Sequence, residues 1–157
     1  MRIGVLSDTH GNIELAKLAL TQMGPIDCLL HAGDHFRDAK ELGVLKKLPV
    51  YAVAGNCDWD ILEPEDITIN AVGKRIWLIH GHRHRVKAGH DTLLHEAKSH
   101  NIDVVIYGHT HVAVSEVVDN ILIFNPGSLT QPRGPQGPTY GVIEIFNGEV
   151  IPYIFQL

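Results

Sequence analysis

The sequence predicts an α/β fold in which two β-sheets face each other and helices cover their outer faces. Over the first two-thirds of the chain, short apolar runs alternate with helical segments, as in βαβ units. The last third contains strand-like segments joined by tight turns. With 157 residues, the chain has the usual size of one domain, so we expect a single domain over residues 1–157.

Five apolar runs predict buried strands, because each is short and bounded by glycine or by helical segments. They cover residues 3–6, 28–30, 51–54, 76–79 and 104–107. Each run ends shortly before a side chain that can bind a metal ion. Open α/β sheets bind their ligands beyond the carboxyl ends of the strands, so these side chains should converge.

Helices are expected between these strands. The first is predicted over residues 13–23, where Asn12 can cap the start and Gly24-Pro25 ends the helix. The second is predicted over about residues 37–47. The third follows Gly89 and should end near Asn101, which can serve as a C-terminal cap.

The strands of the last third should pair antiparallel. Residues 112–118 and 121–124 flank Asp119-Asn120, and residues 140–146 and 149–155 flank Asn147-Gly148, a typical hairpin turn. Residues 67–72 and 76–79 similarly flank Gly73.

The composition of the chain limits the kinds of partner that we expect it to bind. The net charge of -5, with 11 histidines counted as neutral, argues against a general nucleic-acid or anionic membrane surface. Cys28 and Cys57 are the only cysteines, which is poor material for a disulfide framework and predicts a cytoplasmic protein. There is no run of about 18 apolar residues that could span a bilayer. Exposed apolar surface leaves room for a homo-oligomer.

The side chains at the strand ends form a mixed oxygen and nitrogen set. They are two carboxylates, four imidazoles and one amide, from Asp8, His10, Asp34, Asn56, His80, His109 and His111. Such a set is too rich for one tetrahedral ion, so we predict two divalent ions. Imidazole with carboxylate suits borderline metals, and we expect Mn²⁺ first, with Ni²⁺, Zn²⁺ or Fe²⁺ as alternatives.

The motifs around these ligands resemble those of the calcineurin-like metallophosphoesterases, in particular the small bacterial and archaeal YfcE/YsnB-like phosphodiesterases. The matching motifs occur in the family's order: Asp8-Thr9-His10-Gly11, Gly33-Asp34, Gly55-Asn56-Cys57-Asp58, His80-Gly81-His82 and Gly108-His109-Thr110-His111. The resemblance implies the metallophosphoesterase fold, a four-layer α/β/β/α sandwich of two mixed sheets flanked by helices. It also implies metal-dependent phosphoester hydrolysis.

Carried onto matching positions, the resemblance implies two ligand sets that share Asp34 as a bridge. One ion would be held by Asp8, His10 and His111, and the other by Asn56, His80 and His109. The resemblance implies that a hydroxide shared between the two ions attacks phosphorus, which needs ions about 3.5–4 Å apart. Asp34 and Asn56 are therefore expected to be catalytic, and Asp58 to orient a neighbouring ligand.

One position departs from the family pattern. Many members have histidine after the Gly-Asn pair, where it assists the leaving group, but this chain has Cys57. A thiol is a poorer general acid near neutral pH. We therefore expect a preference for esters with good leaving groups, or help from His82 or His84.

The substrate contacts have alternatives. Strand alternation would put His80, His82 and His84 on one face, and we expect His80 to bind metal and His82 to meet the substrate. His82 could equally belong to a solvated basic turn. Arg133 could contact a phosphate oxygen from the Pro/Gly-rich segment after Asn125, although a stiff surface loop explains that segment as well. Asp34 and Asn56 in isolation would suit turns or helix caps.

These observations predict a metal-dependent phosphoesterase, with phosphodiesters as the expected small-molecule substrates. A phosphomonoesterase is one alternative. The other is a non-catalytic scaffold, because a similar fold occurs in the eukaryotic trafficking subunit Vps29, whose counterpart site is degenerate. The complete ligand set of this chain favours the enzyme.

Overall fold

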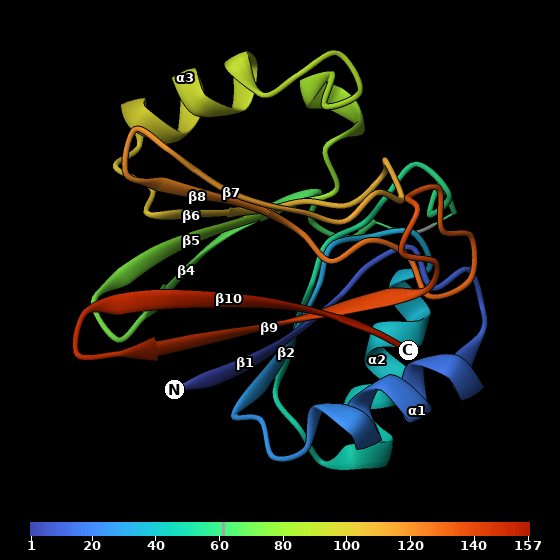
Figure 1. Ribbon diagram of the computed structural model, residues 1–157. Coiled ribbons are helices and arrows are strands. Elements are labelled where there is room, and N and C mark those ends of the chain that lie inside the picture. Colours follow the sequence, from blue (N-terminus) through green and yellow to red (C-terminus); the bar gives the residue numbers. More distant parts are fainter. Residues whose placement is uncertain (61) are drawn as a thin grey trace.

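The computed structural model describes residues 1–60 and 62–157, and the described residues form two five-stranded mixed sheets that face each other (Figure 1). The first sheet has the order β10-β9-β1-β2-β3. Its strands are β1 (Arg2–Leu6), β2 (Cys28–His31), β3 (Val50–Ala52), β9 (Thr139–Phe146) and β10 (Glu149–Gln156). β1, β2 and β3 run parallel, and β9 and β10 add antiparallel pairs.

The second sheet has the order β4-β5-β6-β8-β7. β5, β6 and β8 run parallel, and β4 and β7 pair antiparallel at the two edges. The strands are β4 (Asp66–Ala71), β5 (Lys74–Ile79), β6 (Val104–Ile106), β7 (Val114–Val118) and β8 (Ile121–Asn125). The prediction of two mixed sheets is therefore confirmed.

Helices form the outer layers (Figure 1). α1 (Ile13–Met23) and α2 (Phe36–Lys46) cover the first sheet, and α3 (Asp91–Ser99) covers the second. The Asn12 side chain accepts a hydrogen bond from Leu15 N at the start of α1, as predicted for a cap. The result is the predicted four-layer α/β/β/α sandwich.

Apolar cores on both faces of the sheets explain why the strand runs are apolar at every position. Ile3 and Val5 of β1 face the other sheet, whereas Leu6 packs with α1. Trp77 and Ile79 of β5 pack with α3, and Leu78 between them joins the core between the sheets. Because successive strand residues point to opposite faces, a strand buried on both faces shows no polar alternation.

Two strands end earlier than predicted, and one begins later. The runs predicted over residues 51–54 and 104–107 end in the sheet at Ala52 and Ile106, and the strand predicted to start at 112 starts at Val114. The residues between leave the sheets to form loops. No helix in the described part of the chain is long and apolar enough to cross a membrane.

Candidate metal centre

The predicted ligands lie in the loops that follow five strands, which gather on the right of Figure 1. The loop after β1 carries two ligands, those after β2, β3 and β5 carry one each, and the loop after β6 carries two: Asp8, His10, Asp34, Asn56, His80, His109 and His111. The sites after β1, β2 and β3 belong to one sheet and those after β5 and β6 to the other. The candidate centre therefore spans both sheets.

Left-handed backbone conformations turn the ligands inward. The φ angles of Asp8, His10, Asp34, His109 and His111 are 54°, 45°, 55°, 64° and 60°. β1 and β6 end at Leu6 and Ile106, before these ligands, so strand alternation does not set their directions. Residues other than glycine adopt positive φ at an energetic cost, and such residues concentrate at functional sites.

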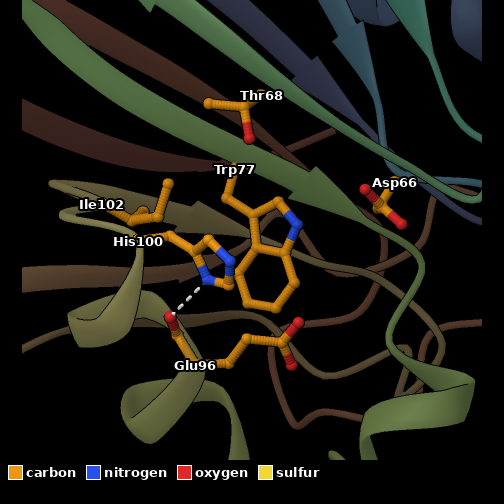
Figure 2. Close-up of a pocket in the computed structure, with 6 residues that line it drawn as sticks. All are labelled: Asp66, Thr68, Trp77, Glu96, His100 and Ile102. Atoms are coloured by element: carbon orange, nitrogen blue, oxygen red, sulfur yellow. Dashed lines mark hydrogen bonds between the residues drawn. The ribbon is translucent and has the colours of Figure 1, made fainter.

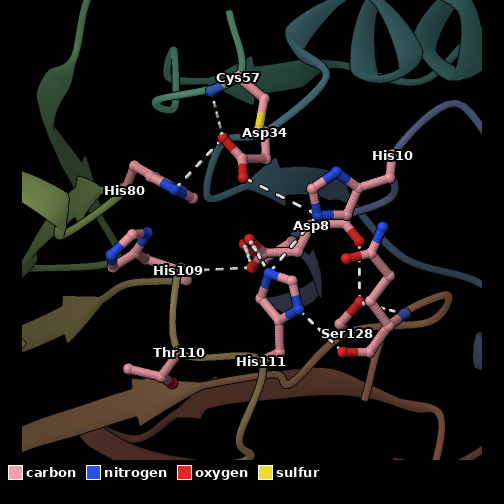
Figure 3. Close-up of polar contacts among 12 residues, drawn as sticks. Asp8, His10, Asp34, Cys57, His80, His109, Thr110, His111 and Ser128 are labelled. Atoms are coloured by element: carbon pink, nitrogen blue, oxygen red, sulfur yellow. Dashed lines mark hydrogen bonds and ion pairs between the residues drawn. The ribbon is translucent and has the colours of Figure 1, made fainter. Parts of the chain in front are cut away.

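The first ligand cluster contains Asp8, His10, Asp34 and His111, and one ligand atom from each lies within 4.8 Å of those of the others (Figure 3). His111 Nε2 is 3.1 Å from Asp8 Oδ1 and 3.5 Å from His10 Nε2. His10 Nε2 is 3.8 Å from Asp34 Oδ2. The three residues assigned to one ion and the assigned bridge thus come together.

The second cluster contains Asp34, Asn56, His80 and His109. His80 Nε2 lies 3.0 Å from Asn56 Oδ1 and 3.3 Å from Asp34 Oδ1, so the two Asp34 oxygens face different clusters. The rings of His80 and His109 lie edge to face with their centroids 5.1 Å apart. Figure 3 shows His80 and His109 on the same side of Asp34.

Hydrogen bonds to the backbone fix which nitrogen faces the centre. His80 Nδ1 lies 2.8 Å from the Ala32 carbonyl oxygen, and His111 Nδ1 lies 2.8 Å from that of Gln131. A carbonyl oxygen only accepts, so Nδ1–H donates in each neutral ring and the Nε2 lone pair points into the centre. This arrangement is the one that metal-binding histidines use.

The donor set fits divalent cations, because lone pairs face each other. His80 Nε2 faces Asn56 Oδ1, and His111 Nε2 faces Asp8 Oδ1. Asp8 Oδ1 is buried and has no hydrogen-bond partner. Buried acceptors without donors are costly, and a cation between them would satisfy all of these atoms at once.

Burial keeps two of the imidazoles in the form that binds metal. Burial is the main cause that lowers the pKa of His109 to about 4. Burial also lowers the pKa of His10 against the opposing effect of Asp34. A neutral imidazole has a free lone pair, so neither ring needs to lose a proton before it coordinates a cation.

A close approach of two loops requires glycine at position 55. A Cβ atom on Gly55 would overlap the Asp34 backbone nitrogen and Oδ1. Cys57 N also donates to Asp34 Oδ1 at 2.9 Å. The loop after β3 therefore fixes the carboxylate that both clusters share.

A buried network missed by the sequence analysis supports the first ligand loop. Thr9, between Asp8 and His10, donates through Oγ1 to Asp38 Oδ2 at 2.6 Å and lies 3.1 Å from His31 Nε2. The same Asp38 oxygen accepts from Gly11 N at 2.8 Å. Thr9 and Gly11 lie within a matched motif, but nothing in their spacing indicates Asp38 or His31.

The segment after β8 supports Asp8 from the opposite side. Ser128 Oγ and Thr130 Oγ1 both donate to the Asp8 carbonyl oxygen, at 2.9 and 3.1 Å. The same segment supplies the Gln131 carbonyl that orients His111. Besides the predicted alternatives of a substrate wall or a stiff loop, this segment thus positions two candidate ligands, Asp8 and His111.

Asp58 positions two backbone segments. Its oxygens accept from Phe36 N, at the start of α2, and from Gly55 N, both at 2.9 Å. Its side chain thereby braces the loops of Asp34 and Asn56. Burial, then hydrogen bonding to Asp34, raises the pKa of the neighbouring Cys57 thiol to about 11.

The histidines after β5 do not continue the strand. β5 ends at Ile79, and His82–His84 form a short 3-10 helix, so the expected shared face of His80, His82 and His84 was wrong. The His82 ring stays near the centre, 5.4 Å from the His80 ring. The His84 ring packs edge-on against Trp77 instead, with centroids 5.1 Å apart.

Two cavities differ in their relation to the centre. One, of about 530 Å³, is lined by Thr110, which stands between two ligands, and by Arg133. The other, of about 100 Å³, is shown in Figure 2 and contains none of the predicted site residues. There the Trp77 indole lies among Asp66, Glu96 and His100. We therefore associate the first cavity with the centre.

Fold and site together define an α/β protein with a metal-ligand cluster at the carboxyl ends of its strands. The chain belongs to the calcineurin-like phosphoesterase superfamily, whose domain model matches residues 1–148. A calcineurin-like phosphoesterase domain with a candidate metal-ligand cluster defines the class of the protein as that of a phosphoester hydrolase.

Individual relatives support the same family assignment. The chain is 35% identical over 158 residues to a protein of Mycoplasma pneumoniae described as a probable metallophosphoesterase, a match that covers 98% of this chain and 96% of the relative. It is 32% identical to a phosphodiesterase of Methanocaldococcus jannaschii, over 81% of this chain and 83% of that protein.

A solved structure of Vps29 from Entamoeba histolytica, in complex with Zn²⁺, superposes with a TM-score of 0.74. The identity is 24%, and the match covers 99% of this chain and 98% of that one. At this identity the comparison concerns the fold alone.

Proposed function

We propose that the protein is a metal-dependent phosphodiesterase with a dinuclear centre, most suited to Mn²⁺. The observation that carries the proposal is the position of Asp34, whose Oδ2 faces His10 and whose Oδ1 faces His80. A carboxylate between two clusters of electron-pair donors is what a bridging ligand requires. The phosphodiesterase of Methanocaldococcus jannaschii, which is 32% identical, supports the choice of diesters.

The residues divide into two ligand sets that share Asp34. Asp8, His10 and His111 would hold one ion, and Asn56, His80 and His109 the other. When bound, the ions would lower the pKa of a water molecule and stabilise the negative charge of the phosphoryl oxygens. Backbone carbonyls hold the His80 and His111 rings, so little reorganisation is needed when substrate binds.

The substrate is a small phosphoester held beside the centre by three further groups. The exposed Asn56 carries one amide oxygen 3.0 Å from His80 Nε2, and its Nδ2 group remains on the open side of the loop, next to Cys57 Sγ. His82 lies next to His80, and Arg133 lines the adjoining cavity. We assign substrate contact to Asn56, His82 and Arg133, and loop positioning to Asp58.

The test compares bis-p-nitrophenyl phosphate with p-nitrophenyl phosphate as substrates of metal-stripped protein, with Mn²⁺, Ni²⁺, Zn²⁺ or Mg²⁺ restored. Asp34→Asn is the matched control, because it removes the charge with little change in size. Metal-dependent hydrolysis of the diester that the variant lacks is the expected result. Faster hydrolysis of the monoester would favour a phosphomonoesterase, and no turnover by metal-loaded protein would favour a scaffold.

A further inference from the structure

A cavity of about 530 Å³ adjoins the candidate metal centre, and its size is typical of small-molecule sites. Thr110 contributes to its wall, and the flanking residues His109 and His111 are predicted metal ligands. In Figure 3, Thr110 lies at the lower edge of the cluster and Asp34 at the upper edge. A substrate held at the centre therefore has space to extend past Thr110.

Two cations face this cavity without a carboxylate partner. Lys87 and Arg133 both line it, and neither forms an ion pair with any residue in the described ranges. The described lining residues include no aspartate or glutamate. In a chain with a net charge of -5, a cavity with two unpaired cations and no lining acid is a local reversal of charge.

Arg133 lies beside the predicted ligand His111 as well as in the cavity wall. Arg133 is also anchored by its backbone, since Arg133 N donates to the His111 carbonyl oxygen at 3.0 Å.

The remaining wall is apolar or already hydrogen-bonded. His90 lies between Glu116 and Tyr107, with Nδ1 2.6 Å from Glu116 Oε1 and Nε2 2.7 Å from Tyr107 Oη. The Glu116 carboxylate, beside this wall, is thus engaged by His90. Val112 and Val114 complete the wall and suit the organic part of a ligand.

We propose that this cavity binds a second phosphate group, carried by the substrate beyond the phosphodiester that is hydrolysed. Lys87 and Arg133 supply charge-assisted hydrogen bonds to that phosphate, and the valine wall contacts the organic group between the two phosphates. The substrate class is therefore an organic phosphodiester with an additional phosphomonoester, such as a nucleoside 3′-phosphate whose 5′-phosphate carries a second ester. The inference rests on the proposed function for its catalytic part, but the cavity's preference is a separate property.

The test uses two esters that differ in one group. Thymidine 5′-(p-nitrophenyl phosphate) and its 3′-phosphorylated analogue share the scissile bond and the leaving group. We expect kcat/KM to be at least about tenfold higher for the 3′-phosphorylated ester, mainly because its KM is lower. In Lys87→Gln and Arg133→Gln, the ratio of the two kcat/KM values should fall toward one. Lys98→Gln is the matched control, because it removes a surface cation that pairs with Asp119 outside the cavity.

A binding experiment separates this inference from the proposed function. Calorimetry with the Mn²⁺-loaded protein would compare thymidine 3′,5′-bisphosphate with thymidine 5′-monophosphate, and does not depend on turnover. Tighter binding of the bisphosphate that depends on Lys87 and Arg133 supports the cavity assignment even if neither ester is hydrolysed, which would refute only the phosphodiesterase. Equal kcat/KM values with equal affinities, or a preference that both variants retain, would overturn the cavity assignment.

Discussion

Asp34 Oδ1 lies 3.3 Å from His80 Nε2, although the two residues follow strands of different sheets. Asp34 follows β2 in the first sheet, and His80 follows β5 in the second. The second ligand cluster is therefore complete only when the two sheets pack against each other. Assembly of the candidate centre thus depends on the packing of the two sheets against each other.

Replacing Cys57 with histidine should broaden the leaving groups that the enzyme accepts. The pKa of the Cys57 thiol is raised to about 11, so the thiol donates a proton poorly near neutral pH. We expect Cys57→His to raise kcat/KM for a diester with an unactivated alcohol about tenfold to 100-fold, with little change for bis-p-nitrophenyl phosphate. Equal effects on both esters, or the same gain in Cys57→Ser, would contradict this role.

Adding one methyl group at Gly55 should disturb the centre. The Cβ atom of Gly55→Ala would overlap the Asp34 backbone and carboxylate, so Asp34 must move. We expect a loss of about 1–3 kcal/mol in the free energy of unfolding and at least tenfold weaker Mn²⁺ binding. Gly134→Ala is the control, because its Cβ would have ordinary contact with Val112 at 3.6 Å. Wild-type Mn²⁺ affinity in Gly55→Ala would refute the argument.

The buried His31 should make the metal-free protein less stable in mild acid. Burial lowers the pKa of His31 from 6.5 to about 4, despite the opposing charges of Asp8, Asp38 and Asp58. Between those pH values the unfolded chain binds a proton that the folded chain excludes. The contribution of His31 is complete above about pH 6.5 and declines as the pH falls toward 4, by up to about 1.4 kcal/mol per pH unit.

The measurement for His31 is urea unfolding of wild type and His31→Gln in chelator at several pH values. Glutamine does not titrate, so the variant should lose stability less steeply than wild type between pH 6.5 and 4. Other acid-sensitive groups are common to both proteins and cancel in the difference. Parallel curves would show that His31 does not titrate as its burial predicts.

A substitution in the turn between β4 and β5 should stabilise the protein. Val72 is 58% exposed and has a φ of 49°, a conformation that β-branched residues disfavour. The equivalent position between β9 and β10 is Asn147, which is suited to this turn. We expect Val72→Asn to raise the free energy of unfolding by about 1 kcal/mol and Asn147→Val to lower it by a similar amount, as measured in urea. A loss of stability in Val72→Asn would contradict the account.

Much of the fold was predictable because local and tertiary requirements coincide. Asn12 and Gly24 mark the ends of α1, and Asn147-Gly148 specifies its hairpin. The order of the ligand motifs predicted which loops would meet. The convergence of the candidate ligands was predictable because they follow buried strands and belong to matched motifs.

The conformations that aim the ligands were not predictable. Asp8, His10 and Asp34 adopt positive φ without being glycine, so no residue type marks the turn. The 3-10 helix at His82–His84 replaced an expected strand continuation. The contacts of Thr9 with His31 and Asp38 join distant positions, and only tertiary packing brings them together.

The number of Mn²⁺ ions bound per chain tests the central claim most directly. Calorimetric titration of metal-stripped protein, with elemental analysis of the saturated sample, should give two ions for wild type. The double variant His80→Ala/His109→Ala should bind one, and Asp34→Asn should bind both more weakly. One ion in the wild type, or two undiminished sites in Asp34→Asn, would contradict a centre in which Asp34 bridges two ions.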